Sequence, residues 1–98
     1  MGSPVCRKTD ITVGICMICR KPSLGKIDTA SDDVKVNSLG AARDTDTVKA
    51  DNCGHTGKIK ATSTTSKVNG KYIAKVGDPF IGDYIGILVN GSPDTTAG

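Results

Sequence analysis

The chain of 98 residues contains no glutamate, no glutamine and no tryptophan, and its only aromatic residues are Tyr72, Phe80 and Tyr84. Glutamate and glutamine are good helix formers. The chain is instead rich in threonine, serine, asparagine and glycine, which favour strands, turns and helix caps. This composition excludes a helical bundle. No apolar run approaches the ~18 residues that a membrane-spanning helix needs.

Charge and hydrophobicity are also low. The formal net charge is only +3, the basic residues are spread along the chain, and few rings are present for base stacking, so nucleic-acid binding has little support. The apolar stretch 11–19 is short and lacks a small-x-small cleavage site, so we expect no signal peptide. A hydrophobic fraction of 37% predicts a thin core, which at this chain length calls for a covalent or metal staple.

An internal repeat organises the chain. Residues 25–46 align with residues 57–78 without a gap and share nine identical residues, where chance gives roughly one or two. Both copies contain Gly-Lys-Ile, Lys-Val-Asn, an alanine and a final aspartate. Residues 4–10 resemble the end of each copy, with a base three residues before an aspartate. We therefore expect about three units, with the chain beginning inside one unit and ending inside another.

Each unit is predicted to form β-structure. A Val-Asn pair followed by serine or glycine is a strong hairpin signal, because both central residues of a type I′ turn have positive φ. We expect such turns after residues 34–36, 66–68 and 87–89. Units this short cannot bury much surface alone, so they should pack around a common axis. The predicted fold class is all-β, a compact pseudo-threefold body with little or no helix.

Two of the three units carry a pair of metal-ligand residues at nearly the same distance after the repeated aspartate. These pairs are Cys16 with Cys19, and Cys53 with His55. If the units surround an axis, both pairs converge on one place. Three cysteines and a histidine form a usual ligand set for tetrahedral structural zinc, which contributes folding free energy directly. We predict one structural metal ion, with zinc the best fit and iron the alternative.

Other interpretations of the cysteines are a Cys16–Cys19 disulfide or redox pair, or small buried thiols with a surface histidine. A redox Cys-x₂-Cys normally opens a helix, and none is predicted here. Cys6 takes the place of the repeated alanine, so we expect it in the core. No catalytic motif is recognisable, and we expect no enzyme. A zinc-ribbon-like interaction module is the main rival function, and a small redox protein is the lesser one.

The repeated charges have an expected structural role. The aspartates should close turns by accepting hydrogen bonds from backbone amides, and the bases should be solvated or paired with these aspartates. The aspartates are Asp10, Asp46 and Asp78, and the bases are Arg7, Arg43 and Lys75.

The repeated segments 4–10, 40–46 and 72–78 resemble the PAAR-repeat family. The signature of that family is roughly Val-Asn-Gly-x-Pro-Ala-Ala-Arg-x-Gly-Asp, repeated and followed by metal-binding cysteine and histidine. Ala-Ala-Arg stands at 41–43, and Val-Gly-Asp at 76–78. The family usually has three histidines and one cysteine as ligands, whereas this chain would use Cys16, Cys19, Cys53 and His55.

The resemblance implies a small conical all-β fold with a metal near the vertex. It implies a single domain over residues 4–93, with 1–3 as an N-terminal extension and 94–98 as a tail. The implied partner is a trimeric β-helical spike, capped by one tip per trimer, in a contractile phage tail or a type VI secretion system. The implied location is the baseplate spike tip of a virion, or the secreted tip of a type VI system. Such a tip would briefly contact the outer membrane of a target cell and would bind no nucleic acid.

Overall fold

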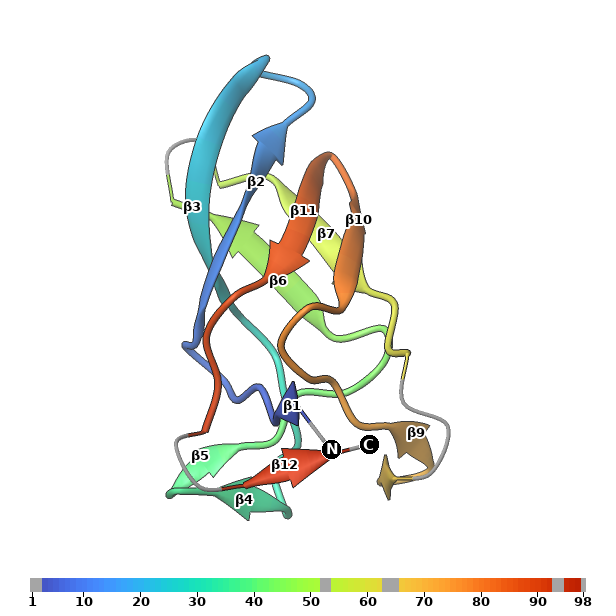
Figure 1. Ribbon diagram of the computed structural model, residues 1–98. Helices are drawn as coiled ribbons and strands as arrows, with labels where there is room; N and C mark the ends of the chain where they lie inside the picture. The colour runs from blue at the N-terminus through green and yellow to red at the C-terminus, as the bar shows by residue number, and fades with distance from the viewer. Residues whose placement is uncertain (1–2, 52–53, 63–65, 93–94, 98) are drawn as a thin grey trace.

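A computed structural model describes residues 3–51, 54–62, 66–92 and 95–97 (Figure 1). Six antiparallel strands close into a barrel in the order β10-β11-β2-β3-β6-β7. Their bounds are β2 Ile11–Cys16, β3 Lys21–Ile27, β6 Thr47–Ala50, β7 Thr56–Ile59, β10 Pro79–Gly82 and β11 Tyr84–Leu88. No helix occurs in the described part of the chain, which confirms the all-β prediction. Accordingly, the described residues contain no helix long and apolar enough to cross a membrane.

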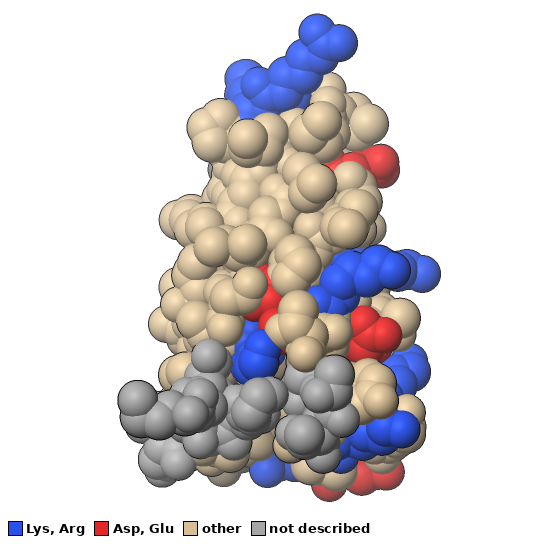
Figure 2. Space-filling model, turned by 45° about the vertical axis from the view of Figure 1, so that its right-hand side comes forward, with Lys and Arg blue, Asp and Glu red and all other residues tan. Residues whose placement is uncertain are grey.

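The barrel consists of three hairpins, β2–β3, β6–β7 and β10–β11, one from each repeat. Below the barrel lie three two-stranded ribbons, β4–β5, β8–β9 and β1–β12. Their bounds are β1 Ser3–Pro4, β4 Lys35–Val36, β5 Leu39–Gly40, β8 Lys67–Val68, β9 Lys71–Tyr72 and β12 Thr96–Ala97. The body measures 35 × 24 × 23 Å and tapers towards the β2–β3 turn (Figure 2). We call the ribbon end, where both chain ends lie, the base (Figure 1).

A closed ring of backbone hydrogen bonds joins the three repeats between barrel and base. The amide of Cys6 donates to the carbonyl of Ala74 (3.0 Å), that of Ala74 to Ala42 (2.9 Å), and that of Ala42 back to Cys6 (3.0 Å). All three side chains are fully buried. The predicted pseudo-threefold arrangement is confirmed, and so is the prediction that Cys6 is a core residue.

The repeated aspartates close turns as predicted. In each repeat the carboxylate accepts a hydrogen bond from the backbone amide of the base three residues earlier, at 2.8, 2.8 and 3.0 Å. It also forms an ion pair with the side chain of that base. The pairs are Arg7–Asp10, Arg43–Asp46 and Lys75–Asp78. The turn and the ion pair therefore depend on one carboxylate in each repeat.

Two of the three expected type I′ turns are present. Asn37 and Ser38 have φ of 52° and 69° between β4 and β5, and Asn69 and Gly70 have 53° and 79° between β8 and β9. The third prediction is wrong: β11 ends at residue 88, and neither residue 90 nor residue 91 has positive φ.

The two ends of the chain form the third ribbon in place of a hairpin. Ser3 pairs with Ala97 and Pro4 with Thr96, so β1 and β12 complete the base. We expected residues 1–3 and 94–98 to lie outside the domain. Ser3 and residues 96–97 nevertheless pair as the third ribbon of the base, and the domain limits drawn from the sequence stay a prediction.

The barrel interior is narrow. Phe80 and Tyr84 pack with ring centroids 4.7 Å apart, and the Tyr84 hydroxyl donates to the Ser23 carbonyl (3.0 Å). Glycine is required where strands approach closely: a Cβ on Gly57 would lie 2.2 Å from the Tyr84 carbonyl oxygen, and one on Gly86 would lie 2.1 Å from the Val13 carbonyl oxygen. Small residues inside let the barrel close, and they leave several large aliphatic side chains outside.

Candidate metal centre

The first two sulfur ligands lie at the end of the β2–β3 hairpin. Cys16 is the last residue of β2 and is buried, while Cys19 lies in the following turn and is exposed. The turn is held by two backbone hydrogen bonds, from the Met17 amide to the Asp83 carbonyl and from the Arg20 amide to the Cys16 carbonyl, each 2.7 Å. Arg20 adopts φ of 57°, which turns the chain back into β3. These contacts place both thiols on one side of the hairpin.

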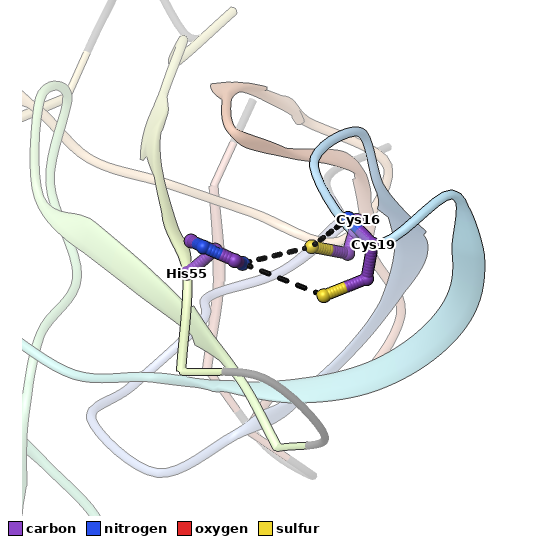
Figure 3. A group of neighbouring side chains, drawn as sticks. All are labelled: Cys16, Cys19 and His55. Atoms are coloured by element: carbon purple, nitrogen blue, oxygen red, sulfur yellow. Dashed lines mark hydrogen bonds between the residues drawn. The ribbon is translucent and has the colours of Figure 1, made fainter.

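The nitrogen ligand comes from the neighbouring hairpin. His55 directly precedes β7, and its carbonyl accepts a hydrogen bond from the Ala50 amide at the end of β6 (2.9 Å). The Gly54 amide donates to the Ala50 carbonyl (3.0 Å), and Gly54 has φ of 71°, a conformation that favours glycine. The imidazole is thereby directed from the β6–β7 turn towards the β2–β3 turn (Figure 3).

The three ligand atoms lie within 4.8 Å of one another. His55 Nδ1 is 3.1 Å from Cys16 Sγ and 3.8 Å from Cys19 Sγ (Figure 3). The Cys19 amide also donates to Cys16 Sγ at 3.4 Å. Such a backbone bond fixes the orientation of a ligand sulfur.

These spacings fit a metal ion. Metal–sulfur bonds of about 2.3 Å and metal–nitrogen bonds of about 2.0 Å at a tetrahedral angle place sulfur and nitrogen ligands roughly 3.6 Å apart. The observed 3.1 and 3.8 Å lie on either side of that value. The Cys16, Cys19 and His55 group could therefore hold a metal ion. The fourth predicted ligand, Cys53, lies outside the described residues.

A metal at this point would join two hairpins where their own pairing ends. The β3–β6 ladder runs only from Ile27, opposite Val48, to Gly25, opposite Ala50, and β3 continues beyond it towards the tip. The Asp51 amide adds one further bond to the Leu24 carbonyl (2.9 Å). A tetrahedral ion would hold the two turns together beyond that point.

The rival interpretations of the cysteines can be compared with their positions. Cys16 and Cys19 form no disulfide with each other, and they lie at the end of a strand and in a turn, not at the start of a helix. Cys6 is not part of the metal-ligand group. Its thiol donates to the Asn90 carbonyl (3.3 Å), and burial raises its pKa to about 12.

One surface feature next to this site was not predicted from the sequence. In β2, the apolar side chains of Ile11, Val13 and Ile15 point outwards, whereas Thr12 and Cys16 are buried. The signal was present in the sequence as an alternation of aliphatic residues with threonine and glycine. The usual rule that the apolar residues of an alternating strand face the core gives the wrong face here, because the inward positions of β2 lie against Tyr84. Thr12 Oγ1 is 3.2 Å from the Tyr84 hydroxyl, and a Cβ on Gly14 would come within 3.0 Å of the Tyr84 ring.

Comparisons with known proteins add no assignment: no family model, no curated protein and no solved structure matches the chain. The resemblance to PAAR repeats therefore stays a prediction, and function has to be argued from the geometry.

Proposed function

We propose that the chain is a non-enzymatic structural tip that caps the trimeric β-helical spike of a contractile injection machine, as in a phage tail. One observation carries the proposal: the cyclic hydrogen-bond ring that joins the residues at 6, 42 and 74. A single chain with internal threefold symmetry can present three similar surfaces to three identical subunits. The three ribbons of the base, β4–β5, β8–β9 and β1–β12, are the elements placed to do so.

The base also offers backbone groups for pairing. Each two-stranded ribbon has outer edges, and a strand edge can pair with another chain. The barrel, by contrast, is closed, so its strands are paired on both sides. The proposed contact with the spike is therefore at the base, and the narrow end with the metal group would point towards the target envelope.

The proposed metal is zinc, held by Cys16, Cys19 and His55, with Cys53 as the expected fourth ligand. A closed set of four protein ligands leaves no position for a catalytic water, so the ion would act as a structural staple. Zinc suits the set because thiolate and imidazole ligands in tetrahedral geometry favour it. Elemental analysis and native mass spectrometry of protein purified without chelator should find one zinc per chain, lost in Cys16→Ser. A stably folded chain without any metal would contradict this part.

Capping is tested by co-expressing the chain with a trimeric β-helical spike from its own source. Size-exclusion chromatography and native mass spectrometry should find one chain per spike trimer. Lys35→Asp with Lys67→Asp at the base should weaken the complex, because both lysines are exposed on equivalent ribbons. Lys49→Asp with Lys58→Asp makes the same charge change on the barrel wall and should leave the complex intact. No complex with any such spike, or equal effects of the two pairs, would contradict the proposal.

A further inference from the structure

One side of the barrel is an exposed aliphatic surface that the proposed capping does not use. Two rows of paired side chains cross strands β11, β2 and β3. The first row joins Ile87, Val13 and Leu24, and the second joins Ile85, Ile15 and Pro22. All six side chains are exposed, with Leu24 at 56% and Ile15 at 50%. We call these six residues the apolar wall.

The apolar wall breaks the threefold symmetry of the barrel. On β6 and β7, the outward positions pair Thr47 with Lys58 and Lys49 with Thr56, so that side is polar. Large exposed aliphatic groups on a chain this small mark an interaction surface, because contiguous apolar patches of this kind are uncommon on isolated soluble domains. The side seen in Figure 2 has a broad uncharged band below the basic side chains at the tip.

The apolar wall continues into the turn that carries the metal ligands. Met17 and Ile18 are exposed at 55% and 59%, and they are followed by exposed Arg20 and Lys21. Strands β2, β3 and β11 contain two lysines, Lys21 and Lys26, and no acidic residue. Acidic residues occur in the adjoining turns, at 51 and 83. Aliphatic side chains next to cations are complementary to a partner that has an apolar interior and negatively charged groups at its surface.

We propose that the apolar wall and the β2–β3 turn bind the interface of an anionic lipid membrane. The side chains would enter the acyl boundary, while Arg20 and Lys21 contact the headgroups. β2, the middle strand of the wall, is paired with β3 and with β11 along nearly its whole length, so it offers no backbone edge to a protein strand. An open groove of about 470 Å³ on this wall, lined by Val13, Pro22 and Leu24 and also by Asp51, adds exposed apolar area. This inference does not depend on a spike partner.

The first test is sedimentation of the full chain with vesicles. The protein should bind anionic vesicles made from an equal mixture of phosphatidylcholine and phosphatidylglycerol. It should bind neutral vesicles of phosphatidylcholine alone much more weakly. Arg20→Gln with Lys21→Gln should weaken binding to the anionic vesicles about 25-fold, since each cation near such a surface contributes roughly fivefold. Lys35→Gln with Lys71→Gln removes the same charge at the base and should leave binding unchanged.

The apolar part is tested separately. Ile15→Thr, which removes two carbon groups from the apolar wall, should weaken vesicle binding about tenfold, whereas Val34→Thr near the base should not change it. The chain has no tryptophan, so Ile18→Trp provides a single fluorescent reporter. Its emission should shift to the blue with anionic vesicles, and that of Val34→Trp should not.

Three results would overturn the proposal. The first is an absence of binding to anionic vesicles by a chain that is folded and metal-loaded. The second is equal binding to neutral and anionic vesicles. The third is a dimer in sedimentation velocity that Ile15→Thr dissociates, because the apolar wall would then be covered by a second copy. Capping of a spike without vesicle binding would refute this inference alone, and vesicle binding without capping would refute only the proposed function.

Discussion

The ion pair between Arg43 and Asp46 provides the sharpest test of how the repeats are held together. The Asp46 carboxylate accepts hydrogen bonds from the Arg43 backbone amide (2.8 Å), from Nε (2.9 Å) and from one terminal nitrogen (3.0 Å), and from the Thr29 hydroxyl (3.2 Å). The Arg43 and Asp46 side chains are only 17% and 5% exposed. Asp46→Ala removes every one of these acceptors and leaves the guanidinium without its counter-ion.

The expected loss is large for a domain of this size. Removing one partner of a buried ion pair costs about 3–5 kcal/mol, and the slight exposure of Arg43 favours the lower figure, about 3 kcal/mol. Arginine keeps its proton at any accessible pH, so Arg43 cannot become neutral to relieve the loss. The total unfolding free energy of a domain is roughly 5–15 kcal/mol, so this loss is a large fraction of it. Each kcal/mol lowers the thermal midpoint of a domain this long by about 4–8 °C, so the midpoint should fall by on the order of 10–25 °C.

The assay is thermal and urea unfolding followed by circular dichroism. Asp28→Ala is the matched control, because the Asp28 side chain is exposed. Asp46→Asn keeps an acceptor oxygen for the Arg43 backbone amide, so its unfolding free energy should lie between those of Asp46→Ala and Asp28→Ala. A replacement of both partners by apolar residues, Arg43→Met with Asp46→Leu, should recover only the part of the loss that comes from the unpaired guanidinium, because the Arg43 backbone amide still lacks its acceptor. If Asp46→Ala and Asp28→Ala differ by less than about 1 kcal/mol, the ion pair contributes only as much as an exposed one.

Three further predictions concern the metal, the barrel interior and the buried thiol. Chelation should lower the unfolding free energy by on the order of 4 kcal/mol when free metal had been a thousandfold above its Kd, with no effect on Cys16→Ser, as thermal melts with and without chelator would measure. Gly57→Ala should cost about 3 kcal/mol in urea unfolding, because its Cβ would meet the Tyr84 carbonyl. Gly70→Asn should cost much less, because the space around it is open and asparagine tolerates the positive φ of 79° better than most residues. Burial raises the pKa of Cys6 from 9.0 to about 12, so the folded chain keeps a proton that the unfolded chain loses. This contribution to stability is complete below pH 9 and should fall as the pH rises towards 12, and urea midpoints on either side of pH 9 should show a slope that Cys6→Ala removes.

How far the sequence predicted the fold depends on which residues the repeats share. The identities between residues 25–46 and 57–78 include the aspartates, the ring alanines and the Val-Asn turns, which are positions where these two repeats have the same neighbours. Those predictions are confirmed. The third Val-Asn-Gly, at 89–91, has the same residue types as the other two turns but does not lie at the equivalent place in its repeat. The structure instead aligns Gly86 and Leu88 with Gly57 and Ile59 of the preceding repeat, because Leu88, like Ile59, donates its amide to the carbonyl of the repeated aspartate.

The metal-ligand prediction rested on a different kind of argument. Cys16 and Cys19 are 36 and more residues from His55, and no local pattern joins them. The repeat register alone placed both pairs at the same level of the fold, and the pairing of β3 with β6 brings their two hairpins side by side. Sequence could not show that Cys19 would be exposed while Cys16 is buried, because this depends on the turn held by the Asp83 carbonyl of the third hairpin.

The two levels of the molecule follow different symmetry for a physical reason. At the ring, each repeat bonds to both of the others, so a change in one repeat disturbs all three, and small side chains are needed at each of the three positions 6, 42 and 74. On the barrel wall an outward side chain touches only its cross-strand neighbours, so one side can be aliphatic while another carries lysine and threonine. The residues shared between the repeats are therefore those that maintain the fold. Other residues differ between the repeats. They are the thiols and the imidazole, which form the candidate metal site, and the apolar wall, which forms the proposed contact surface.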